Sequence, residues 1–254
     1  MALLAPRGSW LTTAAALVLA GAAPAALAGG STGVRAPVAP HTPGAVSVHR
    51  RILLGRSVEG RPIIAVETGN PSSTQKVLVV GCVHGNECAG TAITERLLRL
   101  RPPAQVDLWV ISNLNPDGAF RGSRGNAHGV DLNRNFPWHW LRLQGLYDSG
   151  PRPLSEPESR IVHKLILQLR PTVSIWFHQH LDLVDESGGN LATERQFATL
   201  VQLPLARLTR EPGSITSWEN HTIGGTAFVV ELPPGQLRSE AAARFARAIL
   251  TISR

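Results

Sequence analysis

Apolar runs typical of buried strands recur along most of this chain. Two short runs, 51–54 and 62–66, flank a glycine-punctuated connection and predict a pair of neighbouring strands. Four further runs are continuous rather than alternating, as in strands that are covered on both faces. They occupy residues 76–81, 106–111, 172–177 and 226–230.

Segments with apolar residues at helical spacing lie between these runs. The spacing predicts four helices, over residues 89–100, 156–169, 191–202 and 239–252. Pro102 and Pro103 stop the first of them. Ser155 and Glu158 have the S-x-x-E form of a capping box, so a cap for the second helix is the default interpretation of Glu158. Residues 115–118 predict a turn.

The alternation of strands and helices predicts an α/β fold. We expect one domain with a mixed, largely parallel sheet and helices on both faces. Residues 119–153 form a long loop-rich stretch, and a loop of that length in a compact domain is usually functional or disordered. No internal repeat and no second domain is indicated by the pattern.

The N-terminal part of the chain has the pattern of a targeting segment. Arg7 precedes an uncharged apolar run over 11–22, and Ala26-Leu27-Ala28 has the A-x-A form of a cleavage site. We expect a signal peptide over 1–28, a flexible leader over 29–46 and the folded domain over 47–254; an uncleaved anchor is the alternative for 1–28. No later run is long enough to span a membrane. The mature protein is expected to be secreted or associated with the cell envelope.

Composition and charge narrow the range of partners. The chain has 254 residues, 43% of them hydrophobic, which suffices for one large core. Its net charge of +7 falls to +6 without Arg7, and nearly all of its positive charge is arginine. No basic run is long enough to indicate a nucleic-acid site. Scattered, solvated arginines are the simplest interpretation, and attraction to an anionic cell wall is the alternative.

Candidate metal ligands stand where three of the apolar runs end. His84 and Glu87 follow the run 76–81, His178 follows 172–177, and Glu231 follows 226–230. In an open α/β sheet, ligands bind beyond the carboxyl ends of the strands, so these side chains are expected to meet at one edge. Two histidines and one glutamate, with a fourth position open, form a catalytic zinc set. His180 competes with His178 for the third position.

The order of these motifs resembles the zinc metallocarboxypeptidases of the carboxypeptidase A type. The resemblance rests on His84-Gly85-Asn86-Glu87, on 129–137 with its D-x-N-R-N core, on His178 and on Val230-Glu231-Leu232, and covers the chain from about residue 47. Further motifs at 115–118, 155–158 and 217–221 are similar to a compact bacterial branch that includes the murein peptide amidases. Those enzymes cut the bond from γ-D-glutamate to diaminopimelate in cell-wall peptides.

The resemblance implies a role for each residue of these motifs. One zinc ion per chain would be held by His84, Glu87 and His178, with Asp131 accepting a hydrogen bond from His84. Asn133 and Arg134 would hold the terminal carboxylate of the substrate, which suits the planar fork of arginine.

Two further roles concern the reaction itself. Arg124 would polarise the scissile carbonyl, with Arg121 as its competitor. Glu231 would be the general base, taking a proton from the attacking water and passing it to the leaving amine.

Two features are left open by the sequence. Cys82 and Cys88 bracket the first motif, and they are either a disulfide favoured by export or two free buried thiols. The digestive carboxypeptidases carry a mobile tyrosine between the third zinc ligand and the catalytic glutamate, but residues 182–230 contain none. Tyr147 lies in a different loop, so the clamp is absent or provided by another group. Residues 213–216 correspond to the side-chain pocket of the family. They include no acidic residue, so the sequence gives no indication of a pocket for lysine or arginine.

The sequence therefore predicts an exported zinc carboxypeptidase or amidase. Its substrate would be a murein peptide, or another peptide, with a free carboxylate next to the bond that is cut. The alternatives are a zinc deacylase that acts on N-acyl amino acids and a zinc-containing module that binds cell-wall peptides without turnover. The sequence gives no indication of an oligomeric state.

Overall fold

The computed structural model describes residues 47–253, and the structural statements below concern these residues. The expected signal peptide over 1–28 and the expected leader over 29–46 lie outside the described part of the chain. Within that part, no helix has the length and apolar character that a membrane crossing needs.

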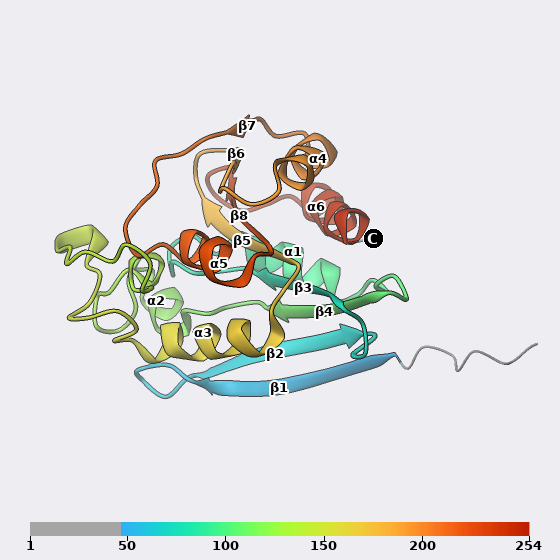
Figure 1. Ribbon diagram of the computed structural model, residues 1–254. Coiled ribbons are helices and arrows are strands. Elements are labelled where there is room, and N and C mark those ends of the chain that lie inside the picture. Colours follow the sequence, from blue (N-terminus) through green and yellow to red (C-terminus); the bar gives the residue numbers. More distant parts are fainter. Residues whose placement is uncertain (1–46, 254) are drawn as a thin grey trace, which may run out of the picture. The chain divides into compact units, whose positions relative to one another are not determined.

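One mixed sheet runs through the described domain (Figure 1). Its strands lie in the order β1-β2-β4-β3-β5-β8-β6-β7. The four central strands β4, β3, β5 and β8 are parallel. Strand β1 pairs antiparallel with β2, β2 with β4 and β6 with β8, whereas the edge strand β7 pairs parallel with β6. The bounds are β1 Val48–Arg56, β2 Pro62–Gly69, β3 Gln75–Val80, β4 Val106–Ile111, β5 Val173–Gln179, β6 Leu183–Asp185, β7 Leu205–Ala206 and β8 Thr226–Leu232. The prediction of a mixed, largely parallel sheet is confirmed.

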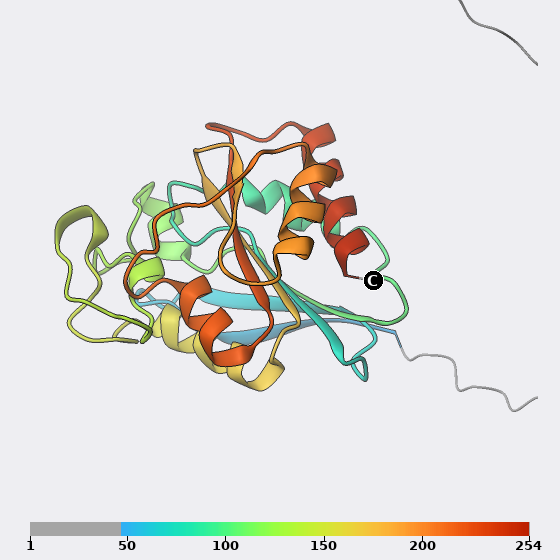
Figure 2. The same cartoon turned by 45° about the horizontal axis from the view of Figure 1, so that its top comes forward.

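Helices cover both faces of this sheet, as Figure 2 shows after the turn that brings the top of the molecule forward. Helices α1, α4 and α6 pack on one face, and α3 and α5 pack on the other. The short helix α2 and the 3-10 turns η1 and η2 lie in the loop region. The bounds are α1 Gly90–Leu97, α2 Pro116–Arg121, η1 Leu132–Arg134, η2 Gly145–Tyr147, α3 Pro157–Leu169, α4 Leu191–Val201, α5 Ile215–Ile223 and α6 Ser239–Ile252.

The sheet separates two apolar cores, which explains the continuous apolar runs of the central strands. Along β5, Ile175 and Phe177 pack with α1, α4 and α6, while Trp176 between them packs with α3 and α5. Every residue of the strand from Val173 to His178 is buried. A strand that is covered on both faces needs apolar side chains in both directions, so its sequence does not alternate.

The capping box predicted for α3 is wrong. Glu156 occupies the N-cap position, and no side chain caps the helix. Ser155 instead donates to the Glu156 carboxylate. Glu158 accepts hydrogen bonds from the Val58 backbone and from Asn126, so it ties the loops around the site together. A capping pattern indicates helix starts on average, but here Glu158 is engaged by distant residues, and the Ser155 hydroxyl is engaged by Glu156 and Asn135.

Other differences concern short elements. The segment predicted as a turn at 115–118 begins helix α2, because Pro116 is compatible with the first helical position and Asn115 Oδ1 accepts from Gly118 N at 2.9 Å. Helix α1 ends at Leu97, three residues before the predicted end. Helix α5 and the strands β6 and β7 were not predicted.

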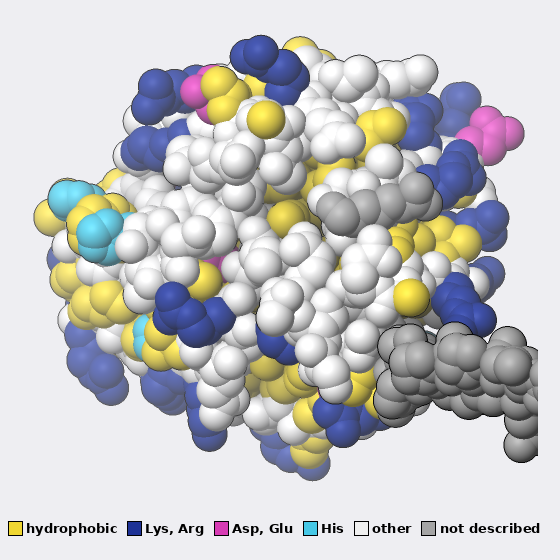
Figure 3. Space-filling view, turned by 45° about the vertical axis from the view of Figure 1, so that its right-hand side comes forward, with side chains coloured by type: hydrophobic (Ala, Val, Ile, Leu, Met, Phe, Trp, Pro, Cys, Tyr) yellow, Lys and Arg dark blue, Asp and Glu magenta, His cyan; other side chains and the backbone are white. Residues whose placement is uncertain are grey.

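Charged side chains are dispersed on the face of the molecule that Figure 3 shows. In the face shown in Figure 3, Lys and Arg side chains are spread around the molecule, with white and yellow surface between them. This agrees with the interpretation of scattered, solvated arginines. A dispersed positive charge favours general attraction to anionic surroundings over a dedicated binding patch.

Candidate active site

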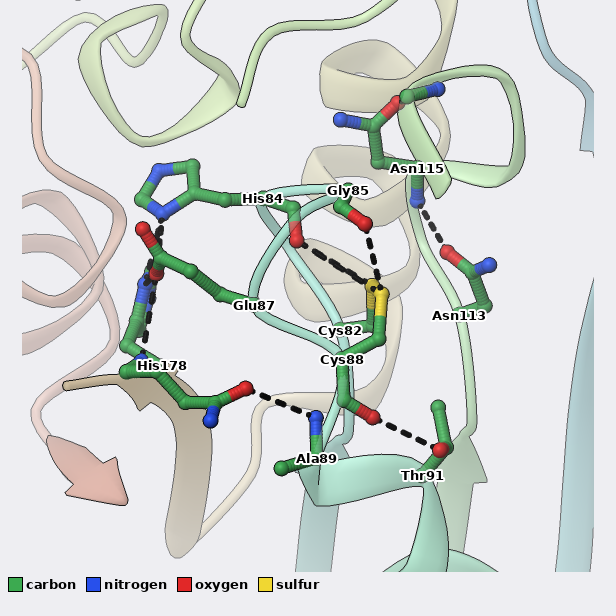
Figure 4. Close-up of a disulfide and its surroundings, with 12 residues drawn as sticks. Cys82, His84, Gly85, Glu87, Cys88, Ala89, Thr91, Asn113, Asn115 and His178 are labelled. Atoms are coloured by element: carbon green, nitrogen blue, oxygen red, sulfur yellow. Dashed lines mark hydrogen bonds and ion pairs between the residues drawn. A yellow bond between two sulfur atoms is a disulfide. The ribbon is translucent and has the colours of Figure 1, made fainter. Parts of the chain in front are cut away.

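The candidate ligands meet at the carboxyl edge of the central strands. His84 and Glu87 lie in the turn between β3 and α1, while His178 lies in β5, the strand next to β3. His178 is also paired in register with Glu231 of β8, so these two side chains start from neighbouring positions on adjacent strands. In Figure 4 the side chains of His84, Glu87 and His178 converge on one point.

The donor atoms of these three residues are close together and buried. His84 Nδ1 lies 2.8 Å from Glu87 Oε2 and 3.1 Å from His178 Nδ1. His178 Nδ1 lies 3.4 Å from the same glutamate oxygen. The three residues are 1%, 8% and 3% exposed, respectively. Two imidazoles and a carboxylate thus point their donor atoms at one shared position away from water.

Electrostatics keeps two of these groups in the forms that a cation requires. Burial lowers the pKa of His178 to about 4, so its imidazole is neutral and carries a lone pair at neutral pH. Burial alone would raise the pKa of Glu87, but hydrogen bonds from His178 and His84 hold that pKa below its ordinary value. Glu87 is therefore a carboxylate.

A disulfide and a glycine shape the turn that carries His84 and Glu87. Cys82 and Cys88 are joined, with their Cα atoms 4.6 Å apart, so the alternative of free thiols does not hold in the structure (Figure 4). Gly85 packs against the backbone of Gly118, where a Cβ atom would lie 1.9 Å from the Gly118 carbonyl carbon. Only glycine fits this close approach. Both features hold the two ligands in a fixed turn.

Asp131 links the ligand turn to Arg124. Its Oδ1 atom accepts from His84 Nε2 at 2.9 Å, and its Oδ2 atom accepts from Arg124 Nε at 3.0 Å. Burial alone would raise the pKa of Asp131, but the charges of His84 and Arg124 lower it below its ordinary value. The structure therefore places Asp131 where the sequence predicted a partner for His84.

Arg124 and Arg121 lie in different surroundings. Arg124 Nη1 lies 2.6 Å from Glu87 Oε1, and the side chain lines the same cavity as the three ligands. Arg121 points away from this cavity and contacts Glu59 and the Ala127 carbonyl. Of the two arginines, the structure brings only Arg124 to the ligand group.

Asn133 and Arg134 line the other side of the cavity. Asn133 Oδ1 accepts from Ile215 N at 2.9 Å, so this hydrogen bond occupies the oxygen of the amide and not its NH₂ group. Arg134 is 7% exposed, and its Nε atom is buried without a hydrogen-bond partner among the described residues. Its Nη2 atom lies 3.7 Å from Glu211. A buried guanidinium with unused donors is suited to an incoming carboxylate.

Glu231 faces the same cavity from β8. Burial, together with the negative charge of Glu87, raises the pKa of Glu231 above its ordinary value. Its Oε2 atom is buried and has no hydrogen-bond partner among the described residues. A carboxylate with a raised pKa and a free oxygen is well suited to accept and return a proton.

Comparison with known proteins agrees with this geometry. The sequence pattern of one family, described as zinc carboxypeptidase, matches residues 42–184.

This chain belongs to the zinc carboxypeptidase family.

Relatives of this zinc carboxypeptidase include bacterial amidases. It is 31% identical to murein peptide amidase A of Escherichia coli (strain K12) over 180 residues, which is 65% of this chain and 74% of the relative. It is 30% identical to murein peptide amidase A of Vibrio campbellii over 197 residues, or 71% and 78% of the two chains.

Solved structures of the family share the fold. The murein-tripeptide amidase from Escherichia coli O157 superimposes with a TM-score of 0.69 at 27% identity, and 85% of this chain and 96% of that chain are covered. The carboxypeptidase A from Helicoverpa armigera gives 0.68 at 18% identity, with 81% and 68% covered, and shows the fold alone. The predicted family and fold class are confirmed.

Membership of the family establishes the enzyme class and the cofactor. This zinc carboxypeptidase is a hydrolase that acts on peptide bonds, and the family uses one zinc ion. The residues present fit that ion. Three ligands around a tetrahedral zinc at 2.0–2.1 Å would lie roughly 3.3 Å apart, close to the separations of 2.8, 3.1 and 3.4 Å found here. His84, Glu87 and His178 would hold it.

His180 is not part of this group. It lies at the end of β5 and is exposed, whereas His178 is buried among the ligand atoms. Two other histidines have separate partners: His128, in a loop, contacts Glu156, and His221, in α5, stacks on Trp138 with ring centroids 3.3 Å apart.

The pocket of the zinc carboxypeptidase contains charges that sequence reasoning missed. The cavity beside the ligands has a volume of about 110 Å³, and Ser214 and Thr216 line it as predicted. Asp185, Arg210 and Glu211 also line it. Asp185 is buried and lies 2.9 Å from Arg210. These residues come from β6 and from the segment before α5, so no local motif connects them with the pocket.

A second, larger cavity adjoins the first. Its volume is about 840 Å³, and it shares Arg210, Glu211 and Ser217 with the cavity beside the ligands. Trp138 and His221 form part of its wall. The two cavities therefore meet on the side of Arg134, where a bulky end of a substrate would have room.

Proposed function

We propose that this protein is an exported, zinc-dependent carboxypeptidase or amidase. It hydrolyses an amide bond next to a free carboxylate, and its substrates are cell-wall (murein) peptides. The observation that carries the proposal is the position of Arg134. Its buried guanidinium, with an unused Nε donor, lines the same small cavity as His84, Glu87, His178 and Glu231.

The proposed reaction follows from the positions of these groups. Arg134 and the NH₂ end of Asn133 hold the terminal carboxylate of the substrate. Arg124 supplies positive charge where the scissile carbonyl oxygen becomes negative. Glu231 accepts a proton from the attacking water and returns it to the nitrogen of the leaving amine. When bound, zinc supplies Lewis acidity, which polarises the carbonyl and acidifies water.

The murein assignment is supported by the relatives and by the charges of the pocket. The related proteins of Escherichia coli and Vibrio campbellii are named murein peptide amidases. Diaminopimelate in murein peptides carries an amine and a second carboxylate at its far end. Arg210 and Glu211 offer a charge of each sign at the junction of the two cavities. Such a pocket suits a residue with a charged, zwitterionic end.

Export is supported by two observations. The N-terminal segment has a signal-peptide pattern, and Cys82 and Cys88 form a disulfide beside the ligands. Disulfides persist in oxidising compartments and are rare in the cytosol. An envelope location would also bring the enzyme to cell-wall peptides.

The proposal is tested with purified protein on murein tripeptide and on peptides with varied C-terminal residues. We expect release of the C-terminal residue, and a chelator should abolish it. Arg134→Ala should raise KM for substrates with a free carboxylate far more than KM for their C-terminal amides, which cannot use the bidentate contact. Equal cleavage of free and amidated substrates by the wild type would refute the proposal.

Two alternatives give different results in the same assay. A deacylase would hydrolyse N-acyl amino acids in preference to peptides. A binding module would retain peptides without releasing any product, but such a module has no use for Glu231 as a proton carrier. The raised pKa and free oxygen of Glu231 favour the enzyme.

A further inference from the structure

Tyr147 stands beside two arginines of the candidate site. It is the single tyrosine of the chain and ends η2 in the loop that follows Arg134. The Arg124 guanidinium carbon lies 5.3 Å from the centre of its ring, and the Arg134 guanidinium carbon lies 5.4 Å from it. Both distances fall within the range of cation–π attraction. One ring thus contacts both cations that are assigned to the substrate.

The two arginines differ in what else holds them. Arg124 is fixed by the carboxylates of Glu87 and Asp131. Arg134 has weaker restraints: Nη1 donates to the Asn133 carbonyl, the nearest carboxylate oxygen lies 3.7 Å away on Glu211, and Nε has no partner among the described residues. The contact with the Tyr147 ring therefore contributes more to the orientation of Arg134 than to the orientation of Arg124.

The loop that carries Tyr147 is tied to the site. Asp131 N donates to the carbonyl of Asp148 at 2.8 Å, and Asn135 Nδ2 donates to the carbonyl of Ser149 at 2.8 Å. Asp148 follows Tyr147 directly, and Asn135 follows Arg134 directly. The backbone that follows the ring is thus bonded to the backbone of Asp131, which contacts Arg124, and to the side chain of the residue that follows Arg134. Tyr147 itself is 48% exposed.

We propose that Tyr147 is a positioning residue, whose ring orients the Arg134 and Arg124 guanidiniums for the substrate carboxylate and carbonyl. The inference rests on the proposed function, since it needs a substrate with a free carboxylate. The ring face attracts two like charges that would otherwise repel each other across the site. The loop that carries Tyr147 lies outside residues 182–230, the segment in which the digestive carboxypeptidases carry their tyrosine.

The test compares three substitutions at this position. Tyr147→Ala should raise KM for free-carboxylate peptides about two- to fivefold, the factor that one exposed cation–π contact represents. For the amidated peptides that KM effect should vanish, because Arg134 has no carboxylate to hold. Tyr147→Phe keeps the ring and should behave like the wild type. Tyr147→Leu keeps apolar bulk without a ring face and should behave like Tyr147→Ala.

The neighbouring residue provides a matched control. Leu146 is 65% exposed in the same turn, and Leu146→Ala should leave both kinetic constants unchanged. Equal effects of Tyr147→Ala on free and amidated substrates, or wild-type kinetics in Tyr147→Leu, would overturn the inference. The proposed function fails separately, when the wild type itself shows no preference for a free carboxylate.

A second measurement needs no turnover. Because the chain has one tyrosine, ¹³C labelling of tyrosine gives one set of ring signals. In the metal-free protein, N-acetylglycine should shift these signals and N-acetylglycinamide should not. The shift should be lost in Arg134→Ala. Tyrosine signals that stay unchanged while calorimetry shows N-acetylglycine bound in an Arg134-dependent way would contradict the role of Tyr147.

Discussion

At the scale of single residues, the ligand set depends on whether His178 of β5 or His180, just after that strand, faces the site. His178 is buried with its Nδ1 atom 3.1 Å from His84 Nδ1, whereas His180 is exposed. We predict that His178→Ala loses zinc and activity together and that His180→Ala retains most of its zinc. Metal analysis after gel filtration measures the zinc content of both variants, and the peptide assay measures their activity. Full zinc occupancy in His178→Ala would reassign the third ligand.

Glu231 gives a second prediction at this scale. Glu231→Gln should keep zinc and substrate affinity but lose turnover by about 10²–10⁴-fold, the usual cost of removing a general acid or base. Steady-state kinetics, together with metal analysis, checks it. Near-normal turnover with full metal would make Glu231 a structural residue of β8.

The residues that sequence alone could predict are those in ordered motifs. The spacing of His84 and Glu87, and the strand ends before His178 and Glu231, place four groups at one sheet edge because parallel strands end together. Asp185, Arg210 and Tyr147 gave no such signal. Their positions depend on the paths of loops, which spacing does not determine.

At the scale of elements, α5 packs on β5 through a buried carboxyl group. Glu219 of α5 accepts hydrogen bonds from Ser174 and from Trp176 Nε1, and burial raises its pKa to about 7. The folded protein therefore holds a proton that the unfolded chain releases near pH 4.5. Between these two values the unfolded state binds fewer protons, so the free energy of unfolding falls as pH rises.

We predict that this loss amounts to about 3 kcal/mol between pH 4.5 and pH 7, and that Glu219→Gln removes it. Glutamine resembles the protonated acid: its oxygen can accept from Trp176 and its NH₂ group can donate to Ser174. Urea unfolding at several pH values measures the difference. A constant difference in unfolding free energy between the wild type and Glu219→Gln across this range would disprove the shifted pKa.

Long, strongly patterned elements were predictable, but short ones were not. Helix α6 has the predicted bounds, and β4 does as well. Helix α2 has six residues and β7 has two, so both are too short for an apolar spacing to repeat along them. Helix α5 is longer, but its polar residues Glu219 and Asn220 face partners in the protein rather than solvent, which obscures the pattern.

At the scale of the whole molecule, the expected processing of the chain can be measured directly. We predict that the exported protein begins at Gly29, after cleavage behind Ala28. N-terminal sequencing of protein recovered from the cell envelope or the medium checks this. Recovery of a chain that still begins at Met1 in the membrane fraction would favour an uncleaved anchor.

The sequence predicts the layered architecture of the domain, but it does not predict the order of the strands in the sheet. Continuous apolar runs between amphipathic helices indicate a parallel sheet with two covered faces, and this is what the structure contains. The order of the strands could not be derived, because β2 pairs with β4 rather than with β3, its neighbour in sequence. Such pairings depend on contacts between distant residues.

The two oxygens of the Asp131 carboxylate are bonded to different halves of the site, one to His84 and the other to Arg124. We therefore expect affinity for the metal and affinity for the substrate to be thermodynamically linked. If zinc changes the affinity for a ligand at Arg124 by some factor, that ligand changes the affinity for zinc by the same factor. Substitutions of His84 and Arg124 should accordingly be non-additive as long as Asp131 joins them. The site behaves as one cooperative unit in which ion and substrate strengthen or weaken each other.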